Sequence, residues 1–238
     1  MPGNFGFVGK KQTGKTSKMV LKVREVAPSG PYIILDTDGE LSFMGEVAYS
    51  LDDVRELWND KQFRIIVDAD QWGEEEMEGL NEFVWELINK LSEKNLEFLY
   101  GVTEIWEYAP SRKLPSAGFT EEGKVLPSYL KRLLKRGDKR GLNFLWDSQR
   151  PAETNTLIPS QANELFVFRL TGGADLKYMS DIIRGIEQPI AGLGAHQYVR
   201  VYGEPLVMET GGPDAVDFDL HKTRQKGQEP KDGMEMEL

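Results

Sequence analysis

The sequence predicts an α/β fold in which helices cover both faces of a mainly parallel β-sheet. Short apolar runs such as "YIILD" and "RIIVD" are continuous rather than alternating. Continuous runs are typical of strands that are buried on both faces. Segments with helical periodicity lie between these runs, which is the order expected when crossover helices connect parallel strands.

Six short apolar runs are predicted to be strands, because each is bounded by polar or turn-forming residues. They span residues 4–8, 32–36, 63–68, 96–103, 142–148 and 165–170. Near the end of the sequence, "HQYVRVYGEPLVMET" contains two further strand-like runs on either side of Gly203 and Glu204. These two runs predict a hairpin appended to the sheet.

Helices are predicted between the strands. The segment "SKMVLKVREV" follows the first strand and is compatible with a helix. In "GLNEFVWELINKLSEK", Leu80, Val84 and Leu87 fall on one stripe with charged residues opposite, which predicts an amphipathic helix. Another helix is expected from Pro127 to about Arg136, with the proline in its first turn.

The remaining segments predict a single domain with a tail. Proline and glycine cluster in residues 110–123, which indicates a mobile surface loop. Residues 213–238 are polar with little to bury, so we expect a flexible C-terminal tail after a domain at residues 1–212.

Composition excludes several classes of protein. The 238 residues contain no cysteine, so disulfides, thiolate metal sites and thiol nucleophiles are absent. Together with the lack of a signal peptide or a membrane-spanning apolar run, this fits a cytoplasmic protein. The net charge of −10 argues against a generally basic DNA-coating protein, but it allows a motor with positive charge on one surface.

A phosphate-binding loop follows the first predicted strand. The motif G-x-x-x-x-G-K-[ST] is matched by Gly9, Lys10, Lys11, Gln12, Thr13, Gly14, Lys15 and Thr16, and Ser17 continues into the predicted helix. Backbone N–H groups of such a loop converge on phosphate oxygens, and the helix presents its positive dipole end. Lys15 is expected to contact the terminal phosphates and the Thr16 hydroxyl to bind Mg²⁺.

A second block resembles a known family. "RGDKRGLNFLWDSQRPAETNTLIPSQANELFVFRL" at residues 136–170 carries an Arg-Gly-rich turn, a Gln-Arg-Pro element, a Ser-Gln-Ala segment and a strand ending in Phe-Arg-Leu. "IILDTDGE" is similar to that family's second strand. In this order, the elements at about residues 5–205 resemble the FtsK–HerA superfamily of DNA-pumping ATPases. The resemblance implies a RecA-like P-loop NTPase fold with ATP and Mg²⁺.

The resemblance also suggests roles for polar residues of this block. Gln149 is placed to hold the attacking water or to sense the γ-phosphate. Arginines just outside the carboxyl edge of a sheet can reach the nucleotide of a neighbouring subunit. The candidates for this role are Arg136, Arg140, Arg150 and Arg169.

One expected acid is missing. The family's Mg²⁺-organising strand ends in Asp-Glu, whereas the corresponding strand here ends in Thr103 and Glu104. In one interpretation, Asp68 at the end of "FRIIVDAD" is the acid on the Mg²⁺ side and Asp70 replaces the glutamate. In the favoured interpretation, Glu104 is the base that activates water, Thr103 is a weakened position, and Asp68 lies at the mouth of the preceding strand.

The resemblance suggests that ATP hydrolysis drives movement on DNA. Residues 124–140 contain seven Lys or Arg and one acid, which suits phosphates of double-stranded DNA or an acidic neighbouring subunit. The family forms rings, usually hexamers. Relatives in segregation, conjugation and end resection carry membrane segments or added domains. The length therefore favours the compact viral or phage genome-packaging ATPases, which act in the host cytoplasm or with the virion.

Other classes stay open. A capsid vertex protein is a possible docking partner for the acidic, Met-rich end of the chain. A HerA-like DNA-processing ATPase, a small P-loop kinase and a non-hydrolysing nucleotide-gated clamp are the alternatives. His196 and His221 have no ligand-type residues beside them in sequence, so both are predicted to be structural or surface residues.

Overall fold

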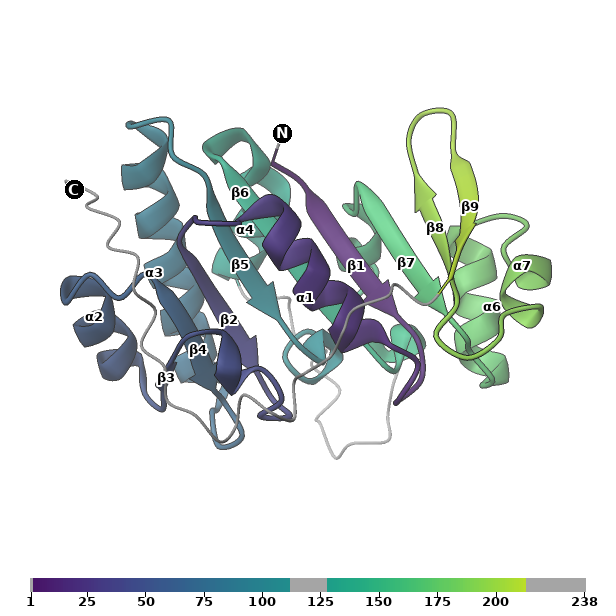
Figure 1. Ribbon diagram of the computed structural model, residues 1–238, viewed down its shortest axis with the longest axis horizontal. Coiled ribbons are helices and arrows are strands. Elements are labelled where there is room, and N and C mark those ends of the chain that lie inside the picture. The colour runs from purple at the N-terminus through teal and green to yellow at the C-terminus, as the bar shows by residue number, and fades with distance from the viewer. Residues whose placement is uncertain (1, 112–127, 213–238) are drawn as a thin grey trace.

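The computed structural model describes residues 2–111 and 128–212, and within them nine strands form one sheet (Figure 1). The strand order is β3-β4-β2-β5-β6-β1-β7-β8-β9. The bounds are β1 Asn4–Val8, β2 Tyr32–Asp36, β3 Glu46–Ala48, β4 Arg64–Asp68, β5 Phe98–Val102, β6 Leu142–Ser148, β7 Glu164–Phe168, β8 Tyr198–Tyr202 and β9 Val207–Gly211. The predicted tail and residues 112–123 of the predicted loop lie outside the described residues.

The strands from β3 to β7 pair in parallel, while β8 and β9 form an antiparallel hairpin on the edge of β7. The predicted α/β fold and the appended hairpin are confirmed. The predicted bounds of β1, β2 and β6 are those observed, and β4, β5 and β7 differ from their predictions by one or two residues at their ends. The edge strand β3 was not predicted, because three residues are too few to show a periodic pattern.

Helices cover both faces of this sheet. The longer helices are α1 Lys15–Val26, α2 Leu51–Asn59, α3 Glu74–Ser92, α4 Ser128–Arg136 and α6 Gly173–Ile182. Helix α1 lies on one face, and the others lie on the opposite face with the short α7 Glu187–Ala191 (Figure 1). A single turn, α5 Leu157–Ser160, and four short 3₁₀ turns complete the described elements.

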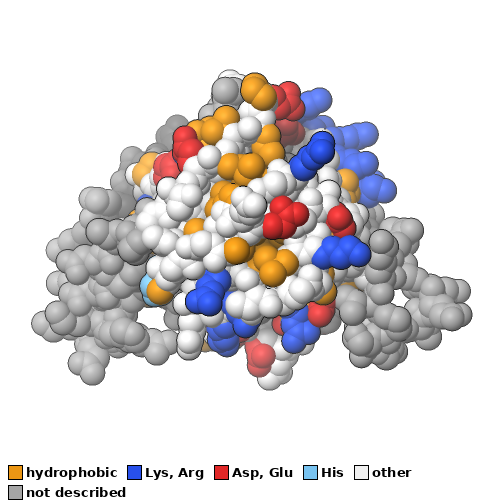
Figure 2. Space-filling view, turned by 90° about the vertical axis from the view of Figure 1, so that its right-hand side faces the viewer, with side chains coloured by type: hydrophobic (Ala, Val, Ile, Leu, Met, Phe, Trp, Pro, Cys, Tyr) orange, Lys and Arg blue, Asp and Glu red, His pale blue; other side chains and the backbone are white. Residues whose placement is uncertain are grey.

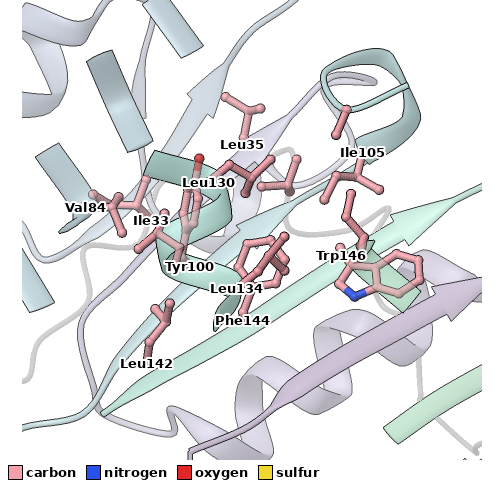
Figure 3. Packing of buried hydrophobic residues seen from close by; sticks show 14 of the residues in the cluster. Ile33, Leu35, Val84, Tyr100, Ile105, Leu130, Leu134, Leu142, Phe144 and Trp146 are labelled. Atoms are coloured by element: carbon pink, nitrogen blue, oxygen red, sulfur yellow. The ribbon is translucent and has the colours of Figure 1, made fainter. Parts of the chain in front are cut away.

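Side chains alternate between the two faces of the strands, so that each face has its own apolar core. Ile34 and Leu145 pack with helix α1, whereas Ile33 and Trp146 belong to the larger core on the opposite face. Figure 3 shows this larger core, where Tyr100 and Phe144 of neighbouring strands lie beside residues of α3 and α4. Burial on both faces explains why these strands read as continuous apolar runs in the sequence.

Parallel pairing brings the carboxyl ends of seven strands to one edge of the sheet. The loop after β1, the residues after β5 and the residues after β6 all lie at this edge, because these three strands are adjacent and in register. Strand β8 runs in the opposite direction, and its first residue, Tyr198, pairs with Phe168 at the end of β7. The segment before β8 therefore also reaches the carboxyl edge.

The hairpin forms the end of the molecule that Figure 2 views face-on. Hydrophobic side chains run down the middle of this face, with basic side chains at its margin (Figure 2). The exposed large hydrophobic residues of the hairpin are Leu206, Val207 and Met208. In the described part of the chain, no helix combines the length and the apolar character needed to cross a membrane.

A tight contact between β1 and β6 gives the first testable prediction. A Cβ atom at Gly6 would overlap the ring of Trp146, which is fully buried. We expect Gly6→Ala to lower the free energy of unfolding by about 1–3 kcal/mol, because the core cannot take the extra methyl group without moving the indole. Denaturant unfolding measures this change.

Gly30→Ala is the matched control, since an added Cβ there meets no atom closer than 3.6 Å. We expect a change within about 0.5 kcal/mol for this variant. Equal losses of stability in the two variants would contradict the packing described for Gly6.

Candidate active site

The loop between β1 and α1 is fastened to the ends of two neighbouring strands. The N–H of Gly9 donates to the carbonyl oxygen of Ser148 over 3.1 Å, and the N–H of Lys10 donates to that of Arg169 over 3.3 Å. Gly14, just before the helix, has a left-handed backbone with φ of 99°, which glycine adopts without strain. The predicted phosphate loop therefore has the required position between a strand and a helix N-terminus.

Lys15 and Thr16, the two loop side chains expected to contact the phosphates and the ion, lie together at the N-terminus of α1. Lys15 is only 5% exposed, and its Nζ donates to the carbonyl oxygen of Lys10 over 3.3 Å, across the loop. The Thr16 hydroxyl donates to Oε2 of Glu40 over 3.2 Å. Glu40 belongs to the "DTDGE" segment after β2, so this contact joins the loop to the next part of the edge.

A pocket of about 290 Å³ opens beside this loop. It is lined by loop and helix residues, by residues at or after the carboxyl ends of β2, β5 and β6, and by one residue before β8. The complete lining consists of Lys11, Gln12, Gly14, Lys15, Thr16, Ser17, Asp36, Asp38, Glu40, Thr103, Glu104, Asp147, Gln149 and His196. The structure thus brings together the predicted loop, Glu104 and Gln149.

Glu104 is held in an unusual backbone conformation. It is 5% exposed and has a left-handed backbone with φ of 45°, which costs a non-glycine residue on the order of 1 kcal/mol. Its N–H donates to Oδ1 of Asp147 over 2.6 Å. Its Oε2 accepts hydrogen bonds from the N–H of Gln149 over 3.0 Å and from Nε1 of Trp106 over 2.9 Å. Both the backbone and the carboxylate of Glu104 are therefore oriented, mainly by β6 and the residues after it.

Asp147 was not predicted as a site residue. It lies in β6, is 4% exposed and lines the pocket. Burial raises the pKa of Asp147 to about 7; the Glu104 carboxylate adds to the rise and Lys15 opposes it. The signal in the sequence was an aspartate directly after the apolar run Phe144–Trp146, two residues before Gln149.

Thr103 occupies the position where the resemblance leads one to expect an aspartate. Its hydroxyl accepts a hydrogen bond from the N–H of Thr37 over 2.9 Å and lies 3.2 Å from the carbonyl oxygen of Leu35. These contacts tie the end of β5 to the end of β2. The Thr103 side chain therefore has a structural role, of which a carboxylate would keep the acceptance from Thr37 and lose the donation to Leu35.

Asp68 and Asp70 do not line the pocket. Asp68 ends β4, which is separated from β5 by β2, and its Oδ1 accepts the N–H of Asp70 at 3.4 Å in a local turn. The expectation that Asp68 lies on the metal side does not fit this placement. The interpretation in which Asp70 replaces the glutamate does not fit it either.

The four predicted arginines divide between the two edges of the sheet. Arg136 ends α4 and Arg140 precedes β6, so both lie at the amino edge, and the expectation that they lie at the carboxyl edge was wrong. Arg140 donates from Nε to Oδ1 of Asn89 over 2.6 Å and lies over the ring of Trp85.

Arg150 and Arg169 follow β6 and β7 and lie at the carboxyl edge. Arg169 is exposed, and the guanidinium of Arg150 lies 5.0 Å from the ring centre of Trp106. Neither of them lines the pocket of this chain.

His196 was predicted to be a structural or surface residue; it is exposed, and it also lines the pocket. It precedes the antiparallel β8 and lines the pocket beside Gly14, where an added Cβ would come within 3.1 Å of its Nδ1. Its backbone is left-handed with φ of 57°. No local pattern in the sequence indicates this contact, because it depends on the reversed direction of β8.

The charges of the pocket favour a phosphate ligand that arrives with a cation. Five carboxylates line the pocket against two lysines, namely Asp36, Asp38, Glu40, Glu104 and Asp147 against Lys11 and Lys15. Among the described residues, no group of three or more ligand side chains could hold a metal by itself. Mg²⁺ needs few protein ligands, since it keeps water and binds substrate phosphates. The Thr16 hydroxyl and the surrounding carboxylates fit such a hydrated ion.

Solved structures share this fold. The genome packaging NTPase B204 from Sulfolobus turreted icosahedral virus 2, in complex with ATP-gammaS, has a TM-score of 0.71 and 19% identity, covering 89% of this chain and 98% of that chain. VirB4 of Thermoanaerobacter pseudethanolicus has a TM-score of 0.60 and 10% identity, covering 91% of each chain. The pCW3 conjugation coupling protein TcpA has a TM-score of 0.56 and 15% identity, covering 94% of this chain and 66% of that chain.

These similarities confirm the predicted P-loop NTPase fold. No family model matches the sequence, and no curated protein matches it.

The raised pKa of Asp147 gives a prediction about stability. The pKa of Asp147 in the folded chain lies above the ordinary value of 3.8. Ionisation of Asp147 is therefore less favourable in the folded chain than in the unfolded chain. The native chain therefore loses stability as the pH rises from about 4 to about 7. Asp147→Asn keeps an acceptor for the Glu104 N–H and carries no charge.

We expect Asp147→Asn to raise the free energy of unfolding at about pH 8 by on the order of 2–4 kcal/mol, with little difference near pH 4. The groups that act on Asp147 are Glu104, Lys15 and Asp38. Denaturant unfolding in metal-free buffer measures the difference at each pH. A difference that does not depend on pH would contradict the prediction.

Proposed function

We propose that this chain is an ATP-hydrolysing motor of the FtsK–HerA superfamily that translocates double-stranded DNA, with viral or phage genome packaging as its role. One observation carries the proposal: the phosphate loop, Glu104 and Gln149 line one pocket. The sheet that holds this pocket has the fold of a viral genome packaging NTPase. The sequence block around Gln149 resembles the same superfamily, which supports DNA as the partner.

The residues of the pocket have distinct roles in the proposed hydrolysis. The loop N–H groups and Lys15 bind the phosphates, and Thr16 is placed to bind the ion. An Mg²⁺ ion held at Thr16 would neutralise part of the negative charge of the nucleotide phosphates. Glu104 accepts a proton from the attacking water, and the Gln149 amide orients that water. Glu104 suits the role of a base because its carboxylate is held by two hydrogen bonds and faces the pocket.

His196 is a further candidate for nucleotide contact. It lies beside Gly14 at the margin of the pocket, on the side of the hairpin. A position next to the phosphate loop suits a contact to the nucleoside or to the phosphates.

A ring, hexameric in the superfamily, would place an arginine of one subunit near the nucleotide of the next. Arg150 and Arg169 fit this role better than Arg136 and Arg140, because they lie at the same edge as the pocket. The two arginines at the amino edge belong instead with the exposed basic side chains of α4, such as Lys131. This basic surface is suited to the phosphates of double-stranded DNA or to an acidic neighbour. A capsid vertex protein remains the proposed docking partner.

Phosphate release in the presence and absence of long double-stranded DNA tests the proposed function. We expect strong stimulation by DNA in the native chain, and loss of turnover in Lys15→Ala because the terminal phosphates lose their cation. Turnover that is indifferent to DNA would support a small kinase or hydrolase instead. Nucleotide binding without phosphate release would support a nucleotide-gated clamp.

The identity of the base gives a separate prediction. Glu104→Gln removes the proton acceptor and is expected to lower turnover at least about 100-fold while nucleotide still binds. Asp68→Asn is the matched control, since Asp68 ends a strand of the same sheet and does not line the pocket. Steady-state hydrolysis and nucleotide binding are measured for both variants. Similar kinetics of the two variants, or the reverse order, would contradict the assignment of Glu104.

A further inference from the structure

Three side chains at the carboxyl ends of β2, β5 and β6, beside the phosphate loop, form one row across the sheet. Leu35 pairs with Val102, and Val102 pairs with Trp146, so the next residue of each strand lies in the same row. The row therefore reads Asp36 on β2, Thr103 after β5 and Asp147 on β6. The position where an aspartate is expected has a carboxylate on each side of it.

Both carboxylates face the pocket from a buried position. Asp36 is 1% exposed and Asp147 is 4% exposed, and both line the pocket with Thr16. Side chains of paired residues in neighbouring parallel strands point to the same face of the sheet. Here that face is the one on which α1 lies, because Ile34 and Leu145, each two residues earlier, pack with α1.

Asp36 lacks a partner for one of its oxygens. Its Oδ2 accepts the N–H of Leu41 over 2.7 Å, whereas Oδ1 is buried without a hydrogen-bond partner in the protein. A buried carboxylate oxygen without a donor is costly and rare in folded proteins. Asp36 lines the pocket, so this oxygen lies in the pocket wall, and a donor in the pocket would meet it once the carboxyl group turns.

We propose that Asp36 and Asp147 together replace the aspartate that is missing at Thr103, by accepting hydrogen bonds from the water molecules of the Mg²⁺ ion that accompanies the nucleotide. The inference rests on the proposed function, since it needs a nucleotide at the phosphate loop. Carboxylates that hold water ligands of an ion need not touch the ion. This agrees with the absence, in the described part of the chain, of a cluster that could hold a metal alone.

The Thr103 hydroxyl does not take part in binding the ion in this proposal, since it holds the end of β5 to β2. Asp147 has a second contact, the acceptance of the Glu104 N–H by Oδ1. The ion-side carboxylate and the proposed base are therefore linked directly. Asp68 extends the same row by one strand, since it pairs with Asp36, but it does not line the pocket.

The test is the Mg²⁺ requirement of nucleotide binding, measured by titrating Mg²⁺ into the full chain with a fluorescent, non-hydrolysable ATP analogue. We expect Asp36→Asn and Asp147→Asn each to raise the Mg²⁺ concentration needed for half-maximal binding of the analogue by about tenfold or more. Asp68→Asn is the matched control and should leave this concentration unchanged. Thr103→Asp in the Asp147→Asn background should restore most of the loss.

Several results would overturn the inference. Native Mg²⁺ dependence in both folded asparagine variants would do so, and so would an equally large effect of Asp68→Asn. If a thermal melt shows that the asparagine variants do not fold, Thr103→Asp alone decides, since a third carboxylate in the row should lower the Mg²⁺ requirement. No such decrease overturns the inference.

Binding of the same analogue without Mg²⁺ separates this inference from the proposed function. A native chain that binds the analogue equally well with and without Mg²⁺ overturns only the role of Asp36 and Asp147. A native chain that does not bind the analogue under either condition overturns both, and Lys15→Ala should then behave like the native chain.

Discussion

The hydrogen bond between the N–H of Glu104 and the carboxylate of Asp147 is the contact on which the arrangement of the site depends. It crosses from the end of β5 to β6 and holds Glu104 in a left-handed conformation that this residue would not adopt without support. With the backbone held, the Glu104 side chain meets the N–H of Gln149 and the indole of Trp106. The order β5-β6-β1 then sets this carboxylate opposite the phosphate loop.

The same arrangement concentrates negative charge where a phosphate ligand would have to bind. Buried carboxylates at three adjacent strand ends line the pocket together with Lys15, and burial raises the pKa of Asp36 as well as that of Asp147. Such a pocket is unfavourable for a bare polyanion and favourable for one that carries Mg²⁺. Stability and the proposed function therefore oppose each other at Asp147, because the charge proposed to act on the ion weakens the fold when no ion is bound.

The sequence predicted what depends on local pattern and missed what depends on strand order. The phosphate loop and the strands around it follow from spacing and apolar runs, so they were predicted with nearly correct bounds. Asp36 and Asp147 were missed as site residues because their neighbourhood exists only once β2, β5 and β6 are adjacent. His196 reaches the pocket only because β8 runs antiparallel. The position of Arg140 at the amino edge follows from the sequence pattern itself, since a residue that precedes a parallel strand lies at the amino end of that strand.

The proposed function requires that the pocket uses ATP to move the chain along double-stranded DNA. Displacement of a third strand from a DNA triplex, placed some distance from the loading site, measures this movement directly. We expect displacement that requires ATP and is lost in Lys15→Ala and in Glu104→Gln. Phosphate release stimulated by the same DNA, without any displacement of the third strand, would contradict it.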